Sequence, residues 1–277
     1  MSAMPPMVIT AAMVGAEVTR AQTPALPITA EEIGEDAAKC REAGAAMVHI
    51  HVRTPEGKPS QDTELFRAAI RAIRSRCDVL IQVSTGGAVG MSVDERCGPL
   101  KLTGSDRPDM ATLSTGTVNF GDDVFWNPRP LVRDIATRIK ALGLRPEIEC
   151  FDAGMVDEAY ALEKEGFLAF PAHFDFVLGV GGALAARPEA LDFLRGYVPA
   201  GSTWTCAAMG RHQLPFVELS AERGGNARVG LEDNIYLSKG VLAKGNYELV
   251  AEAARRAKGK GRVLATPQEA RELLRLS

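Results

Sequence analysis

The sequence predicts an α/β protein folded as a (β/α)8 TIM barrel, a closed ring of eight parallel strands surrounded by helices. Strand-like apolar runs alternate with helical patterns eight times along the 277 residues, and this alternation is typical of βα units around a parallel sheet. The length suits one such barrel, and no low-complexity tract divides the chain. We therefore expect a single domain over residues 1–277, with an open doubly wound sheet as the alternative.

The predicted strands are short runs of apolar and β-branched residues bounded by turn residues. They cover residues 7–12, 46–53, 79–84, 110–113, 147–151, 174–178, 202–206 and 227–229. Eight short strands separated by helices favour a closed barrel over an open sheet.

Capping signals place helices between these strands. Thr29 with Glu32, and Ser92 with Glu95, have the spacing of a capping box, so each pair marks a helix start. Two later helices are expected to begin where a proline follows Asn127 or Arg187, and Asn127 is the expected N-cap of the first of these. Two other helices are expected over residues 62–76 and 267–274.

Composition excludes several classes of function. The net charge is −3, with no run of Lys or Arg, which argues against nucleic acid or an anionic membrane surface as a partner. The chain has neither a secretory leader pattern nor an apolar run of roughly 20 residues, so we expect a cytoplasmic protein. Its five cysteines are far apart and never in CxxC, which fits a reducing compartment. No GxGxxG follows the first strand and no P-loop motif occurs, which disfavours a nucleotide-dependent enzyme of the Rossmann or P-loop type.

Two of the four histidines lie two positions apart in the second predicted strand. Side chains alternate between the faces of a strand, so His49 and His51 should point the same way. Two imidazoles on one face are the usual beginning of a divalent metal site that still needs an oxygen ligand and an open position. The alternative is a polar strand end in contact with water.

Other polar residues fall where predicted strands end. Because barrel enzymes carry their chemistry at the carboxyl ends of the strands, residues from five strands should converge on one face. They are the histidine pair, Ser84, Ser114 with Thr115, Glu149, and the tract over residues 227–234.

The missing oxygen ligand should come from the eighth strand. Glu232 and Asp233 leave this strand at the barrel mouth, and we assign Glu232 to the metal and Asp233 to general base chemistry beside Arg228. The alternative is that both acids cap the following helix. Glu149 lies nearer the mouth than Glu147 on the fifth strand, and a carboxylate pointing into a barrel needs a partner.

The predictions for the other two histidines and for Arg211 are weaker. His173 precedes the sixth strand, at the wrong end for the site, and is expected to be structural. His212 lies in the loop after the seventh strand and is more typical of a surface or capping residue than of a ligand. Arg211 in the same loop is a candidate for a phosphate contact.

With these residues assembled, the sequence resembles the β-keto acid cleavage enzymes, a family with members in lysine fermentation. The matching stretches span nearly the whole chain in order. They are residues 15–18 (GAEV), 23–29 (TPALPIT), 49–53 (HIHVR), 82–87 (QVSTGG), 115–120 (TGTVNF), 146–152 (PEIECFD) and 228–234 (RVGLEDN).

The resemblance implies a barrel with one catalytic Zn²⁺ held by His49, His51 and Glu232, in a homotetramer. The implied reaction is of the retro-Claisen type. A β-keto acid and acetyl-CoA would give acetoacetate and the CoA thioester of the remaining acyl group.

The resemblance also implies roles for other residues. Asp233 matches the family's base and would remove a proton to make a carbon nucleophile from acetyl-CoA, with Arg228 and Glu149 positioning groups and balancing charge. Ser84, Gly87 and one hydroxyl, from Ser114 or Thr115, would hold the substrate carboxylate or keto oxygen. The residues that bind CoA are not identified.

Glu17 points to the kind of β-keto acid. Family members with amino-bearing or trimethylammonium-bearing substrates resemble this chain in having a carboxylate at this place, where it would pair with the cation. Glu17 therefore predicts a cationic substrate such as 5-amino-3-oxohexanoate or a dehydrocarnitine-like compound.

Two other interpretations remain open. A metal-dependent hydrolase of the amidohydrolase type also begins with HxH on a strand, but it usually needs further histidines at later strand ends. A barrel with a structural or adventitious metal and a binding function is the third possibility.

Overall fold

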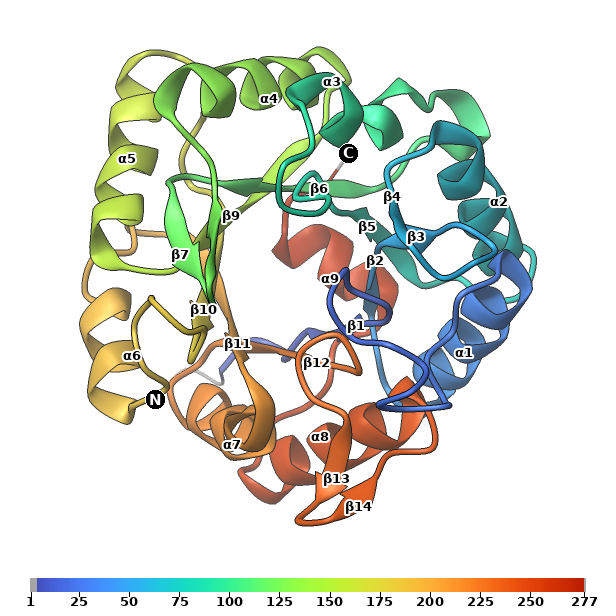
Figure 1. Ribbon diagram of the computed structural model, residues 1–277. Coiled ribbons are helices and arrows are strands. Elements are labelled where there is room, and N and C mark those ends of the chain that lie inside the picture. The colour runs from blue at the N-terminus through green and yellow to red at the C-terminus, as the bar shows by residue number, and fades with distance from the viewer. Residues whose placement is uncertain (1–3, 277) are drawn as a thin grey trace.

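A computed structural model describes residues 4–276 and contains the predicted closed barrel rather than an open sheet (Figure 1). All neighbouring barrel strands pair in parallel. In chain order the barrel strands are β1 (Ile9–Ala12), β2 (Met47–Ile50), β5 (Leu80–Val83), β6 (Met110–Ser114), β9 (Arg145–Cys150), β10 (His173–Leu178), β11 (Thr203–Ala208) and β12 (Asn226–Val229). Pairing of β1 with β12 closes the ring.

The helices surround this ring, as Figure 1 shows in a view along the barrel. They are α1 (Ala30–Ala43), α2 (Thr63–Arg74), α3 (Val93–Arg96), α4 (Arg129–Ala141), α5 (Ala153–Lys164), α6 (Pro188–Arg195), α7 (Gln213–Glu222), α8 (Asn246–Gly259) and α9 (Pro267–Leu273). The last of them closes the end of the barrel where the strands begin, because Ala270 and Leu274 pack on Val8, Met47 and Met110. The opposite end, at the carboxyl ends of the strands, stays accessible.

Capping signals in the sequence mark two helix starts correctly. Thr29 and Glu32 form a capping box at α1, and Ser92 and Glu95 form one at α3. The helix α3 is a single turn and is followed by two 3-10 turns (Gly98–Lys101 and Gly104–Asp106). Pro99, three residues after the end of α3, lies in the first of these turns and lacks the N–H that a longer α-helix would need there.

The expected N-cap of α4 is wrong by one residue. Pro128, not Asn127, is the N-cap. The side chain of Asn127 instead accepts a hydrogen bond of 2.8 Å from the guanidinium of buried Arg96. The contact with Arg96 thus uses the side-chain oxygen that would otherwise cap the helix.

The predicted strand over residues 46–53 is also shorter than expected. β2 ends at Ile50, and His51 lies outside it. The next residues form β3 (Val52–Arg53), which pairs antiparallel with β4 (Pro59–Ser60) above the barrel. Two further hairpins were not predicted, β7 (Val118–Phe120) with β8 (Asp123–Phe125) and β13 (Tyr236–Ser238) with β14 (Val241–Leu242).

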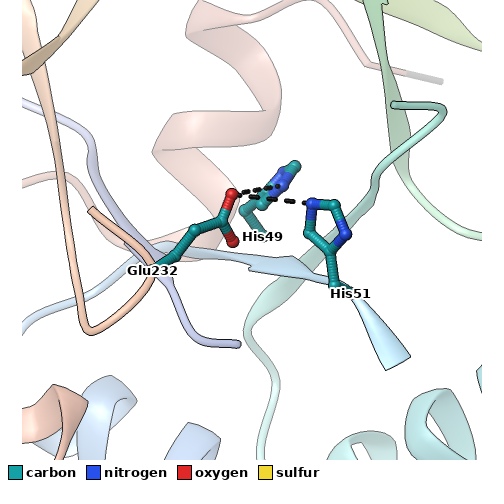
Figure 2. A group of neighbouring side chains, drawn as sticks. All are labelled: His49, His51 and Glu232. Carbon is teal, nitrogen blue, oxygen red and sulfur yellow. Dashed lines mark ion pairs between the residues drawn. The ribbon is translucent and has the colours of Figure 1, made fainter. Parts of the chain in front are cut away.

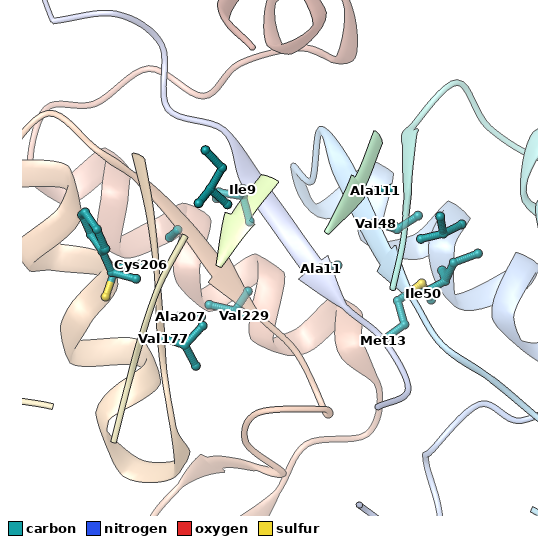
Figure 3. Close-up of a cluster of buried hydrophobic side chains, with 14 of the residues drawn as sticks. Ile9, Ala11, Met13, Val48, Ile50, Ala111, Val177, Cys206, Ala207 and Val229 are labelled. Carbon is teal, nitrogen blue, oxygen red and sulfur yellow. The ribbon is translucent and has the colours of Figure 1, made fainter. Parts of the chain in front are cut away.

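Most of the apolar core lies outside the barrel wall. Ile9, Val48 and Val229 alternate with polar residues along their strands and are fully buried with the helices that cover the ring. Figure 3 shows part of the apolar core, with buried side chains from several strands. Burial of this layer against the helices stabilises the ring.

The inside of the barrel is polar. Side chains that alternate with the outer apolar layer point inward and are buried: Thr10, His49, Gln82, Thr112, Glu147, Asp175, Thr205 and Arg228. Barrel interiors are more often filled by branched apolar residues. We call this set the polar interior, and its upper members form the floor of the site described below.

Within residues 4–276, no helix combines the length and the apolar character needed to cross a membrane.

Candidate active site

A pocket of about 140 Å³ opens at the carboxyl ends of the barrel strands. Most of the site residues that were predicted from the sequence line it. Those that line it are Glu17, His49, His51, Ser84, Gly87, Glu149, Arg228, Glu232 and Asp233. The expectation that polar groups from distant strands meet at one end of the barrel is therefore met by the geometry.

The two imidazoles and Glu232 converge on one point. Nε2 of His49 and Nε2 of His51 are each 3.5 Å from the same oxygen, Oε1 of Glu232, as the dashed lines of Figure 2 mark. Two ligand atoms that lie about 2.1 Å from one ion in tetrahedral geometry are about 3.4 Å apart. The three side chains are thus spaced like neighbouring ligands of one divalent ion, and they form one of the candidate metal groups in the described part of the chain.

An unpaired atom supports the same interpretation. Oε2 of Glu232 is buried and has no hydrogen-bond partner among residues 4–276. Burial of an unpaired carboxylate oxygen is costly, and a cation beside it removes this cost. The donor set of two nitrogens and one carboxylate oxygen suits zinc and similar ions, and leaves a coordination position open.

Two glycines allow Glu232 to reach the histidines. A Cβ at Gly15 would lie 2.6 Å from Cγ of Glu232, and a Cβ at Gly230 would lie 2.1 Å from the carbonyl oxygen of Ala12. The missing side chains let the loops after β1 and β12 approach each other closely. The Glu232 amide then donates to the Ala12 carbonyl at 3.2 Å, which fixes the loop that carries the carboxylate.

Gln82 fixes the orientation of one imidazole. Its Oε1 lies 2.7 Å from Nδ1 of His49, and both residues are buried. With Nδ1 as the donor, Nε2 carries the free lone pair and faces Glu232, as metal binding requires. The sequence analysis missed this residue, although its position on the strand next to the histidine strand, facing inward, was a usable signal.

Arg228 joins the carboxylates at the pocket floor. Its Nε and Nη2 donate to the two oxygens of Asp233 at 2.9 and 3.0 Å, and Nη2 also donates to Oε1 of Glu232 at 2.6 Å. Nη1 lies 3.8 Å from Oε1 of Glu149. One buried guanidinium therefore holds three acids from two strand ends in fixed positions.

The protonation states at the floor follow from burial and this guanidinium. Burial raises the pKa of Asp233 above its ordinary value although Arg228 opposes the shift. Burial also acts to raise the pKa of Glu232, but Arg228 and the two histidines outweigh it and hold that pKa well below the ordinary value. Burial lowers the pKa of His49, and the charge of Glu232 overcomes this effect and raises it. Glu232 is accordingly the anionic ligand, and Asp233 is the stronger base.

The hydroxyls after the fourth barrel strand take different positions. Ser114 donates to Oε2 of Glu149 at 2.6 Å, whereas Thr115 donates to the carbonyl of Met155 at 2.9 Å. Neither residue lines the pocket. Thr115 thus holds a loop together beneath the site, and Ser114 orients Glu149.

The rim of the pocket carries Glu17 and the glycine-rich loop. Ser84, Gly86 and Gly87 line one side, and the Ser84 hydroxyl accepts from the Gly86 amide at 3.0 Å. Gly87 has φ of +66° and faces Met91 and Arg96, where a side chain has no room. Glu17 lies at the solvent-exposed edge of the pocket.

The other histidines and Arg211 are not part of the pocket. His173 begins β10, is buried, and lies 3.2 Å from Glu147 at the closed end of the barrel. His212 packs edge-on against Phe216, and Arg211 is exposed beside it. The further histidines that an amidohydrolase-type site needs are therefore not brought to the histidine pair.

An aromatic wall was also missed. Phe120 and Phe125 of the β7–β8 hairpin and Phe151 line the pocket and contact one another edge to face. The guanidinium of Arg96, the last residue of α3, lies 5.0 Å from the centre of the Phe125 ring and so connects the hairpin to α3. A short hairpin inside a loop leaves only a weak pattern in the sequence.

Comparisons with known proteins agree with this geometry. The chain is 50% identical over 272 residues to a 3-keto-5-aminohexanoate cleavage enzyme of Fusobacterium nucleatum, with 98% of each chain covered. It is 41% identical to a 3-oxoadipate:acetyl-CoA acetyltransferase of Cupriavidus necator, covering 98% of this chain and 95% of that one. A solved structure of ObcA with oxaloacetate shares the fold, with a TM-score of 0.81, 23% identity, and coverage of 93% of this chain and 69% of that one.

The model of one family matches nearly the whole chain. Residues 6–276 match the beta-keto acid cleavage enzyme model, and the barrel, the convergent pocket and the relatives at 41–50% identity point the same way. The chain belongs to the family of beta-keto acid cleavage enzymes.

Proposed function

We propose that the protein is a zinc-dependent enzyme that exchanges acyl groups between a β-keto acid and acetyl-CoA. The observation that carries the proposal is the meeting of His49, His51 and Glu232 at one point, directly beside the Asp233–Arg228 pair. A Zn²⁺ ion at that point would act as a Lewis acid that stabilises negative charge on the keto and carboxylate oxygens of the substrate. The names of the relatives support acetyl-CoA as the second substrate.

Atom balance decides where the carbon nucleophile forms. Acetoacetate contains the acetyl group of acetyl-CoA joined to the CH2–COO⁻ part of the β-keto acid, so the new bond forms at C2 of the β-keto acid. The expectation that the nucleophile comes from acetyl-CoA is therefore wrong, because that carbanion would lead to acetate. The proton must instead leave C2 of the β-keto acid.

Asp233 would take this proton and return it. After proton removal, C2 attacks the thioester carbonyl of acetyl-CoA and the CoA thiolate leaves. The thiolate then attacks the original keto carbon, the C2–C3 bond breaks, and C2 of acetoacetate receives the proton from Asp233. No proton is gained or lost overall, so one carboxyl group is sufficient.

The remaining residues of the floor and rim position groups for these steps. Arg228 holds Asp233 through two hydrogen bonds and fixes the direction of its oxygens. Glu149, oriented by Ser114, balances the charge of Arg228 from the other side. Ser84 and the loop at Gly87 face the pocket and would receive the substrate carboxylate.

Glu17 supports a cationic β-keto acid as substrate. It lies at the rim of the pocket, where its carboxylate can face the tail of a bound substrate. The relative at 50% identity is named for an amino-bearing β-keto acid, whereas the relative at 41% is named for 3-oxoadipate. Assembly as a homotetramer and a cytoplasmic location stay predictions from the family resemblance.

A panel of substrates tests the function. Protein mixed with acetyl-CoA and 5-amino-3-oxohexanoate should release acetoacetate, and removal of the metal by a chelator should reduce the rate at least about 100-fold, because a Lewis acid contributes several kcal/mol. Added Zn²⁺ should restore the rate. Product formation without CoA would favour a hydrolase instead, and an unchanged rate in metal-free protein would refute the role of the ion.

Gln82 should control metal affinity. Gln82→Leu removes the acceptor that orients His49, so the affinity for Zn²⁺ should fall about 10-fold to 100-fold. Gln82→Glu keeps an acceptor at this place and should retain tight binding. Competition with a chromophoric chelator measures both values, and equal affinities of Gln82→Leu and the unmodified protein would exclude this role.

Glu17 should control substrate choice. Glu17→Gln removes the negative charge at the rim and should lower kcat/KM about tenfold for 5-amino-3-oxohexanoate, as expected for loss of one charge-assisted contact, with little change for 3-oxohexanoate, whose tail carries no charge. Glu56→Gln, an exposed substitution away from the pocket, is the control. Equal losses on both substrates would remove the argument for a cationic substrate.

A further inference from the structure

One acid of the polar interior has no role in the chemistry described above. Asp175 is fully buried in the middle of β10, and its neighbours in register are Glu149 on one side and Thr205 on the other. Neither of its carboxyl oxygens has a hydrogen-bond partner among residues 4–276. An ionised carboxylate in such surroundings is very costly.

Two further acids surround it. Oxygens of Glu147, Glu149 and Asp175 all lie within 4.8 Å of one another. Buried carboxyl groups this close cannot all be ionised, because the like charges repel strongly in an environment of low polarity. At least one of the three must therefore carry a proton.

The contacts of the three acids differ in a way that locates the proton. Glu147 has the imidazole of His173 at 3.2 Å. Glu149 accepts from Ser114 and faces Arg228. Both of these acids have donors that favour the ionised form, whereas Asp175 has none.

We propose that Asp175 is a neutral carboxylic acid in the working protein, and that it donates its proton in a hydrogen bond to Glu147, whose buried Oε1 has no other partner among residues 4–276. Asp175 is then a positioning residue, which holds Glu147 ionised and leaves the carboxylate of Glu149 to Ser114 and Arg228. The inference extends the proposed function, but the protonation state itself can be measured without turnover.

The charges around Asp175 are consistent with this state. The titratable groups near it on its own and neighbouring elements are Glu147, Glu149, Cys150, His173, Cys206, Arg228 and Asp233. Burial is the largest cause that raises the pKa of Asp175, well above its ordinary value, and the nearby Glu147 adds to it while Arg228 opposes it.

The predicted state has a definite effect on stability. When an acid has a higher pKa in the folded protein than in the unfolded chain, the folded state binds more protons between the two pKa values, so stability falls as pH rises through that interval. Asp175→Asn has no such proton. Relative to the unmodified protein, this variant should gain up to about tenfold per pH unit in its folding equilibrium as pH rises above about 4.

Infrared spectroscopy tests the protonation state directly. A neutral carboxylic acid has a carbonyl stretch distinct from that of a carboxylate and from the amide bands. The unmodified protein near pH 7 should show this band, carboxyl-labelled aspartate should shift it, and Asp175→Asn should abolish it. Asp106→Asn is the matched control, because Arg67 and Arg71 hold the pKa of Asp106 at about 2 and it is already ionised.

The outcomes separate this inference from the proposed function. An acid band that does not shift with labelled aspartate, or that persists in Asp175→Asn, would overturn it, and so would a stability difference that is independent of pH. The labelling experiment needs no variant, and an acid band that fails to shift overturns the inference even if Asp175→Asn does not fold. Since none of these measurements uses a substrate, absence of the proposed enzymatic reaction would leave their results valid.

Discussion

The central constraint on this barrel is the concentration of negative charge in its interior. Glu147, Glu149 and Asp175 lie close together at the bottom of the pocket and below it. Glu232 and Asp233, which follow the eighth barrel strand, also line this pocket. Buried carboxylates persist only where cations, donors or protons compensate them. The guanidinium of Arg228, an ion between the imidazoles, and a proton on Asp175 would together compensate this negative charge.

The fold separates the apolar core, which lies outside the strands, from the charged groups inside the barrel. Most of the apolar core lies between strands and helices, so the main apolar contribution to stability comes from outside the barrel interior. The interior is therefore available for polar groups that would be costly in an ordinary core. Glycines at positions 15 and 230 complete the arrangement, because they let the first and last barrel strands bring a carboxylate against the imidazoles.

Much of this arrangement follows from sequence patterns. Period-two alternation predicted that His49 and His51 point the same way, and the order of strands predicted that His49 and Glu232, 183 positions apart, meet at one end. What the patterns missed depends on tertiary contacts. The hairpin with Phe120 and Phe125 is too short to leave a periodic signal. Asn127 does not cap the helix as expected, because its side-chain oxygen accepts a hydrogen bond from the buried guanidinium of Arg96. Local propensity does not predict contacts between segments that are far apart in the sequence.

The most direct measurement of the central claim is X-ray absorption at the zinc edge on the purified, active protein, together with its metal content. The account predicts one zinc ion per chain, with a first shell of two imidazole nitrogens and carboxylate or solvent oxygens and no sulfur. A sulfur shell, a shell without imidazole, or fully active protein with no bound divalent ion would contradict it.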